Sequence, residues 1–375
     1  MLEAAHELTD GGAPAASEPG GAAAAGEDAP GRRSITLERP RRAEFGDYST
    51  NAALVLAPAL GEPPREVAER LGEALQKRLG ASLDRFEVAG PGFLNLFLAG
   101  SWLADALGQL LAAGEGFGAG GAPRPERVLV EFVSANPTGP MHVGHARNAA
   151  YGDALARLLE FHGQTVEREF YINDAGSQIR RFGESIQALA RGEAVPEDGY
   201  MGDYVVGLAE SLPDASQADA AQLGRAAVAE MLADTRRSLE TFNVRPFDHW
   251  QSETELHEGE PSRVERTLAL LEEHGYTYSS EGALWLRTTD FGDDKDRVLV
   301  RSNGEHTYFA SDIAYHQARR ERGFDRQIDV WGADHHGYLQ RTKAAYAALG
   351  GDPAELELLI MQLVHLVRSG ERAQM

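Results

Sequence analysis

Residues 127–145 constrain the fold of this chain more than any other stretch, and they read Arg-Val-Leu-Val-Glu-Phe-Val-Ser-Ala-Asn-Pro-Thr-Gly-Pro-Met-His-Val-Gly-His. The run Arg127–Val133 is short, mostly apolar and rich in valine, which predicts a strand buried on both faces. The prolines and the glycine of Ser134–Pro140 stop strand pairing, and apolar residues at helical spacing predict a helix from Gly144 to His162. The helix N-terminus therefore points back at a polar loop, where its free N–H groups and partial positive charge suit a phosphate.

The rest of the C-terminal part alternates strands and helices, which is typical of a parallel sheet. Strand Thr165–Ile172 completes a βαβ unit, and the alternation resumes near residue 311. We therefore predict a doubly wound, Rossmann-like α/β domain over residues 127–375, with its ligand over the strand ends where the two halves meet. Its second half is expected to contain helix Ser311–Arg322, strand Gln327–Trp331, helix Tyr338–Leu349 and strand Glu357–Leu366.

A mainly helical segment at about residues 177–296 separates the two halves. It is too long for a crossover connection between neighbouring strands, so we expect it to be an insertion. Beyond it, Asn303-Gly304 predicts a hairpin turn that joins strand Arg297–Arg301 to a strand at Thr307–Phe309.

The residues before position 127 predict a smaller α+β domain over residues 35–113, with helices at Asp47–Leu56 and Arg65–Leu79. Five glycines and two prolines in Gly114–Pro125 indicate a linker, which we place at residues 114–126. Residues 1–34 are rich in glycine and alanine, and we expect them to be a disordered tail.

Composition excludes several classes of protein. The chain has no cysteine, so it contains neither disulfides nor thiolate metal sites, and it has no apolar run long enough to span a bilayer. These features fit a cytoplasmic protein without membrane association. The net charge of −22 does not by itself suggest nucleic acid, so an RNA partner must be held by local basic patches.

The string His142-Val143-Gly144-His145 resembles the HIGH signature of class I aminoacyl-tRNA synthetases. By itself this motif is matched about equally well by two surface histidines at a helix start. The wider string Glu-Phe-Val-Ser-Ala-Asn-Pro-Thr-Gly-Pro-Met-His-Val-Gly-His-Ala-Arg, followed by Tyr171-Ile172-Asn173-Asp174-Ala175-Gly176, resembles the arginyl-tRNA synthetase family in particular. Gly46–Asn51 and Ala89–Phe93 also resemble that family's extra N-terminal domain, which implies contact with the outer corner of tRNA.

The resemblance implies an arginine–tRNA ligase: ATP, brought with Mg²⁺, activates L-arginine, and the arginyl group passes to tRNA(Arg). It also implies a cytoplasmic enzyme that is monomeric when full length, and a first step that needs bound tRNA. The likeness covers residues 35–375 and stops at Gln374-Met375, where a second, Lys-Met-Ser-Lys-like signature begins. The lysine of that signature is not in the sequence, so we expect a C-terminally incomplete catalytic domain that is inactive alone.

The same resemblance assigns roles to single residues. His142 and His145 are the expected catalytic donors to the triphosphate, and the ATP site is expected to include them with Gly144, Asp334 and His335. Recognition of a guanidinium needs carboxylate acceptors. The resemblance assigns contact with the guanidinium of arginine to Tyr308 and Asp312. The remaining expected arginine contacts are Glu131, Ser134 and Asn136 from the first strand end.

Physical alternatives accompany three of these assignments. Taken alone, Asp312 is more readily read as a helix N-cap near Ser311. Glu131 is a lone carboxylate in an apolar strand, so it needs a cation nearby to offset its desolvation. The string Asp334-His335-His336-Gly337 suggests a metal site, but adjacent histidines point apart and no third ligand recurs, so no dedicated metal is expected.

Two other functions remain open at this point. One is a non-catalytic protein that binds arginine, ATP or tRNA. The other is a nucleotidyltransferase that shares only the His-x-Gly-His loop, which the flanking strings and the helical insertion disfavour.

Overall fold

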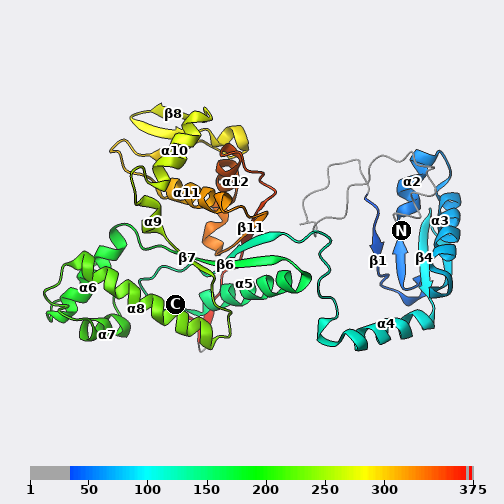
Figure 1. Ribbon diagram of the computed structural model, residues 1–375, viewed down its shortest axis with the longest axis horizontal. Coiled ribbons are helices and arrows are strands. Elements are labelled where there is room, and N and C mark those ends of the chain that lie inside the picture. Colours follow the sequence, from blue (N-terminus) through cyan, green and yellow to red (C-terminus); the bar gives the residue numbers. More distant parts are fainter. Residues whose placement is uncertain (1–33, 369–370, 374–375) are drawn as a thin grey trace. The chain divides into compact units, whose positions relative to one another are not determined.

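The computed structural model of the chain describes residues 34–368 and 371–373, so the tail expected at residues 1–34 lies almost wholly outside the described residues. The chain forms two compact units, Met1–Phe117 and Gly118–Met375, which we describe one at a time (Figure 1). Among the described residues, no helix combines the length and the apolar character needed to cross a bilayer.

The first unit is built on an antiparallel sheet with strand order β1-β2-β4-β3. Helix α3 packs on this sheet because Leu71 and Leu75, one turn apart, contact Leu94 and Leu96 of strand β4 in a common core. The elements are β1 (Leu37–Glu38), β2 (Tyr48–Thr50), α2 (Ala52–Leu60), α3 (Pro64–Leu79), β3 (Leu83–Ala89), β4 (Phe93–Leu98) and α4 (Gly100–Ala113).

The helix predicted at Asp47–Leu56 is wrong in its first turn. Residues Tyr48–Thr50 form strand β2, paired with Leu96–Leu94 of β4, and helix α2 begins only at Ala52. The Thr50 hydroxyl accepts a hydrogen bond from the Ala52 N–H, which closes the turn between the two elements. Pairing with a distant strand overrides the local helical pattern here.

The second unit contains a five-stranded sheet with the order β12-β11-β5-β6-β7, and all four strand pairs are parallel. The strands are β5 (Arg127–Glu131), β6 (Thr165–Ile172), β7 (His249–Ser252), β11 (Arg326–Trp331) and β12 (Leu356–Ile360). The chain runs outward from β5 to β7 and then returns to β11 on the other side of β5. The strand order therefore reverses between β5 and β11, and the predicted doubly wound α/β fold is confirmed.

Three helices of this unit lie close to the sheet ends. Helix α5 (Val143–His162) joins β5 to β6, as predicted, and packs on β5, β6 and β11. Helix α11 (Tyr308–Glu321) precedes β11, and α12 (Leu339–Ala348) lies between β11 and β12. The core around β5 combines Val128, Val130 and Phe132 with Phe170 and Phe247.

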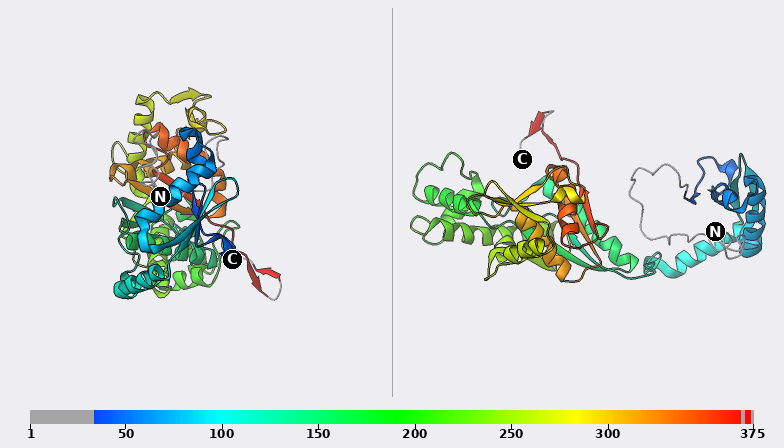
Figure 2. Two further views of the ribbon diagram at one scale, coloured as in Figure 1. Left: turned by 90° about the vertical axis from the view of Figure 1, so that its right-hand side faces the viewer. Right: turned by 90° about the horizontal axis from the view of Figure 1, so that it is seen from above.

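The segment expected to be one insertion at about residues 177–296 contributes a strand to the central sheet. Helices α6 (Ser177–Ala190), α7 (Asp203–Ser211) and α8 (Ala220–Thr241) connect β6 to β7, and they gather at one end of this unit (Figures 1 and 2). Strand β7 has only four residues, His-Trp-Gln-Ser, all half-buried, so it carries no alternating apolar pattern. The remaining elements are α9 (Glu253–His257), α10 (Arg263–Glu273), and β8 (Thr277–Ser280), β9 (Ala283–Leu286) and β10 (Arg297–Val300), which form a small antiparallel sheet.

Two further boundaries differ from expectation. Thr307–Phe309 is not a strand: an isolated bridge joins Val300 to His306, and α11 begins at Tyr308. The Thr307 hydroxyl donates to the carbonyl of Val298 and accepts from the Ala310 N–H, so it caps the helix. The strand expected at Glu357–Leu366 ends at Ile360, and Leu366–Arg368 (β13) pairs instead with Glu371–Ala373 (β14).

Candidate active site

The two histidines of the His-x-Gly-His motif cap the N-terminus of α5. His142 Nδ1 accepts from the Gly144 N–H at 3.2 Å, and His145 Nδ1 accepts from the His142 N–H at 3.3 Å. The rings are stacked, with centroids 3.7 Å apart. Because each Nδ1 accepts a backbone proton, each neutral ring carries its own proton on Nε2. Both side chains therefore act as donors in front of the helix N-terminus.

Burial, together with His142, lowers the pKa of His145 to about 4. His145 is thus a neutral imidazole at physiological pH, and it offers a hydrogen bond rather than a formal charge. Gly144 lies between the histidines, where an added Cβ would meet the His142 ring at 3.0 Å. The glycine keeps the capping arrangement compact and leaves backbone accessible to a ligand.

Asn148, one turn further along α5, ties this helix to both halves of the sheet. Its side-chain oxygen accepts from the Val133 N–H at 2.8 Å, and its amide donates to the Val330 carbonyl at 2.8 Å. Asn148 is buried, so these two bonds fix the helix start against the ends of β5 and β11. Sequence reasoning did not single out this residue, since it carries no local signal of its role.

The loop after β5 has a strained backbone. Val133 and Ser134 adopt positive φ values of 70° and 38°, which are unusual for residues other than glycine. The Ser134 hydroxyl donates to Glu131 at 2.6 Å and accepts from the Tyr171 N–H at 3.1 Å. Strain of this kind is held by surrounding contacts and is concentrated at functional sites. Asn136, further along the same loop, is exposed.

Glu131 has the cationic partner that its burial requires, and this partner belongs to the chain itself. The Arg319 guanidinium pairs with one Glu131 oxygen, while Ser134 donates to the other. Burial raises the pKa of Glu131, and Arg319 opposes that shift. Both oxygens of Glu131 thus already accept hydrogen bonds from the chain. The direct contact expected between Glu131 and the substrate arginine stays a prediction.

Tyr308 and Asp312 both lie on α11, one helical turn apart, and not at a strand-to-helix junction. Thr307 is the N-cap, so the reading of Asp312 as a cap is wrong. Burial raises the pKa of the Asp312 carboxyl above its ordinary value. Tyr308 is 66% exposed and stands at the mouth of a cavity of about 680 Å³.

A second carboxylate, Glu253, is the first residue of α9 and lies near Asp312. It is 4% exposed, and the Tyr171 hydroxyl donates to it. Burial and the nearby charge of Asp312 raise the pKa of Glu253 to about 7. In the described part of the chain, no arginine or lysine forms an ion pair with Asp312 or Glu253. Arg341 and His316 are near enough to oppose the raised pKa of Asp312, but neither carboxylate is engaged in an ion pair with an arginine or lysine of the described residues, so both can accept an external guanidinium.

Glu253 was missed by sequence reasoning because strand β7 was missed. It follows β7 directly, so it stands at the same carboxyl edge of the sheet as Glu131. An alternative assignment of His249–Ser252 as a strand would have placed it there.

The Asp334–His336 segment follows β11 in a short 3₁₀ turn, Ala333–Tyr338. His335 lies between Trp331 and Tyr338, with ring centroids 5.4 and 5.3 Å away. His336 is exposed, and the side chain of Asp334 lies outside the described part of the structure. The roles expected for Asp334 and His335 at the nucleotide remain predictions.

Two family models match the chain. One is described as the arginyl-tRNA synthetase N-terminal domain and matches residues 22–98; the other is the catalytic domain of class I (R) tRNA synthetases and matches residues 107–195. A Thermus thermophilus arginyl-tRNA synthetase structure, 23% identical, shares the fold with a TM-score of 0.68 over 88% of this chain and 62% of its own. The parallel sheet and the histidine-capped α5 thus define a class I aminoacyl-tRNA synthetase catalytic domain.

The curated relatives identify the family within that class. An arginine–tRNA ligase of Syntrophotalea carbinolica is 46% identical over 91% of this chain, and that of Bacillus subtilis is 42% identical over the same share. The chain belongs to the arginyl-tRNA synthetase family. It spans 63% of the length of both relatives.

Proposed function

We propose that the protein acts in arginine–tRNA ligation, forming arginyl-adenylate from L-arginine and ATP and passing the arginyl group to tRNA(Arg). One observation carries the arginine part: the buried Glu253 and the half-buried Asp312 lie close enough to influence each other's charge, and neither forms an ion pair with an arginine or lysine of the described residues. A guanidinium inserted between them would receive charge-assisted hydrogen bonds in a low-dielectric site. Tyr308 would cover it from the cavity mouth.

The other end of the site suits the triphosphate. His142 and His145 present Nε2 donors at the N-terminus of α5, where the helix dipole favours an anion. The attacking carboxylate of arginine is already ionised, so the site needs positioning and charge stabilisation and no general base. Mg²⁺ would arrive with ATP, since this ion is usually bound through substrate phosphates.

The same proposal covers the remaining family properties. Ser134 and Asn136 would contact the amino-acid backbone, and Asp334 and His335 would contact the nucleotide. The first unit would contact tRNA, with Arg39, Arg41 and Arg42 at a cavity of about 850 Å³ as candidate phosphate ligands. The expected setting is a single chain in the cytoplasm.

A non-hydrolysable arginyl-adenylate analogue tests the site by binding alone. Calorimetry should show that the arginyl analogue binds at least about a hundredfold more tightly than its citrullyl counterpart, which has the same shape but no positive charge. Equal affinities would contradict the role of the two carboxylates. Arginine-dependent exchange of pyrophosphate into ATP, measured with tRNA present, then distinguishes a ligase from a protein that only binds these ligands.

A further inference from the structure

Three acidic residues form a row across the centre of the catalytic sheet. Glu131 of β5 is in register with Glu169 of β6 on one side and with Asp329 of β11 on the other. Register partners in a parallel sheet point to the same face, so the three side chains lie next to one another. All three are buried, with exposed fractions of 5%, 0% and 0% in the order given.

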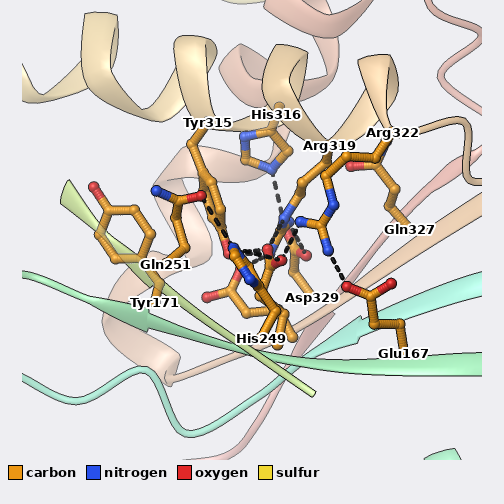
Figure 3. A network of polar contacts seen from close by, with 12 residues as sticks. Glu167, Tyr171, His249, Gln251, Tyr315, His316, Arg319, Arg322, Gln327 and Asp329 are labelled. Atoms are coloured by element: carbon orange, nitrogen blue, oxygen red, sulfur yellow. Dashed lines mark hydrogen bonds and ion pairs between the residues drawn. The ribbon is translucent and has the colours of Figure 1, made fainter. Parts of the chain in front are cut away.

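Such a row is unstable without a cation, because neighbouring buried carboxylates repel one another and lose their hydration. Arg319, the deepest cation of α11, supplies the charge and is wholly buried (Figure 3). Its Nε donates to Glu169 at 2.8 Å, its Nη1 donates to Asp329 at 2.7 Å, and its Nη2 donates to Glu131. A single guanidinium thus joins three strands.

The row is connected to the proposed arginine site by two short routes. On one side, Asp329 pairs with His316 Nε2 at 3.0 Å, and His316 Nδ1 contacts the Asp312 carbonyl at 2.8 Å. On the other side, Glu131 receives the Ser134 hydroxyl, which fixes the strained loop after β5. The first route ends on the backbone of Asp312, whose carboxylate is assigned to the guanidinium, and the second ends on Ser134, which is assigned to the amino-acid end of the substrate.

We propose that Arg319 is a positioning residue of the arginine site, which holds Asp312 and the Ser134 loop in register by clamping the Asp329–Glu131–Glu169 row. The inference rests on the proposed function, since it concerns the geometry of the same pocket. Arg319 touches no substrate in this scheme. Its three donor groups fix the directions of the carboxylates that hold the residues facing the ligand.

The two histidines at the nucleotide end are not bonded to this clamp, and their helix is joined to β5 and β11 separately, through Asn148. His142 and His145 are held by backbone N–H groups of their own helix turn, and neither contacts the carboxylate row. Loss of Arg319 should therefore weaken arginine binding and leave ATP binding unchanged. A purely structural role would either affect both ligands or affect neither.

The test measures L-arginine and Mg-ATP affinities of the purified chain by calorimetry. Arg319→Met should weaken L-arginine binding by about tenfold to a hundredfold, as expected when contact groups shift by about 1 Å, and change ATP affinity by less than about threefold. Arg319→Lys keeps the charge and should restore most of the arginine affinity. The matched control is Arg320→Met on the same helix, because the partners of Arg320 in the described part of the chain are the Leu349 and Gly350 carbonyls and Gln317, and none belongs to the carboxylate row.

Asp329→Asn keeps the proposal testable if Arg319→Met does not fold. It retains the shape of the side chain but weakens the link to His316, so arginine affinity should fall by about threefold or more while ATP affinity is kept. Unchanged arginine affinity in a folded Arg319→Met or Asp329→Asn variant overturns the clamp alone. A wild-type chain that binds ATP but no arginine overturns the proposed function and the clamp together.

Discussion

At the scale of single residues, the carboxylates near the site form two sets, which differ in whether an arginine of the chain forms an ion pair with them. Glu131, Glu169 and Asp329 all receive Arg319, and Glu169 also receives Arg322. Asp312 and Glu253 form no ion pair with an arginine or lysine among the described residues, and the pKa of each is raised, although the charge of Arg341 partly opposes the shift at Asp312. The first set stabilises the fold around the site, and the second is available to a cationic ligand.

The first prediction concerns Asp312. Asp312→Asn removes a charge-assisted acceptor of the guanidinium and should weaken arginine binding by about 2–4 kcal/mol, with little change in ATP binding. Calorimetry with each ligand measures both effects. The control is Glu305→Gln, which changes an exposed carboxylate on the cavity that Tyr308 and Glu253 line, and it should leave arginine affinity unchanged. Equal losses for arginine and ATP in Asp312→Asn would count against the assignment.

The second prediction concerns pH. A guanidinium favours ionised Glu253, whose pKa in the free protein is raised to about 7. Arginine affinity should therefore rise from pH 6 to pH 8, and binding near pH 7 should release a proton. Calorimetry in buffers of different ionisation enthalpy measures that release, which Glu253→Gln should abolish.

The raised pKa of Glu253 also predicts how the free energy of unfolding changes with pH. The Glu253 pKa is higher in the folded protein than its ordinary 4.5, so its ionisation opposes folding. Its favourable contribution is complete below pH 4.5 and is lost as pH rises through about 7. Glu253→Gln should accordingly be more stable than wild type at pH 8, by about 2–3 kcal/mol, and this gain should disappear at pH 4.5. A gain that does not change between these pH values would contradict the raised pKa.

At the scale of elements, close helix contacts position the long β6–β7 connection. Helices α6 and α8 cross where two glycines face backbone: a Cβ added at Gly183 would lie 1.8 Å from the Ala220 carbonyl oxygen. A Cβ at Gly224 would lie 2.1 Å from the Ile179 carbonyl oxygen. Neither neighbour can move without its helix, so the two glycines set the distance between α6 and α8.

The third prediction follows from this crossing. Gly183→Ala should force α6 and α8 apart and lower the free energy of unfolding by about 1–3 kcal/mol. The matched control is Gly207→Ala in α7, where an added Cβ meets nothing within 4 Å. There the helix propensity of alanine should raise stability by about 0.5–1 kcal/mol. Chemical denaturation of both variants measures the difference, and a neutral Gly183→Ala would show that the crossing is looser.

At the scale of the whole molecule, the two units have separate cores. One core of the first unit combines α3 with β3 and β4, and the main core of the second surrounds β5 and β6. Residues 114–121, which follow α4, are exposed throughout. An exposed segment rich in glycine is readily bound by a protease, because its backbone has few contacts to lose.

The fourth prediction is that brief digestion with a nonspecific protease makes its first cut in the described part of the chain within residues 114–121. Mass spectrometry should find one fragment that ends there and a second that begins there. The excised first unit should still unfold cooperatively in urea, since its core does not include residues of the second unit. First cuts within α6–α8 instead would show that the helical connection is less stable than the boundary between the units.

Local patterns in the sequence were sufficient for part of this description. The valine-rich run predicted β5, the helical spacing predicted α5, and the string around His142 and His145 identified the family. These features depend on neighbours within one or two turns, where side-chain period and capping directly encode structure. The start of α10 at Arg263 is also encoded locally, since Ser262 and Glu265 form a capping box.

Only the tertiary structure decided the partners of the charged residues. Arg319 and Glu131 are separated by 188 positions, and Glu169 and Arg319 by 150, so no local pattern links them. Strand β7 likewise has no local pattern, because its polar residues form a strand only by pairing with β6. That pairing brings Glu253, which follows β7, close to Asp312. Sequence determines which groups are available within a turn or a strand, whereas the folded sheet decides which buried charges meet, because closing such long loops requires the whole core to form.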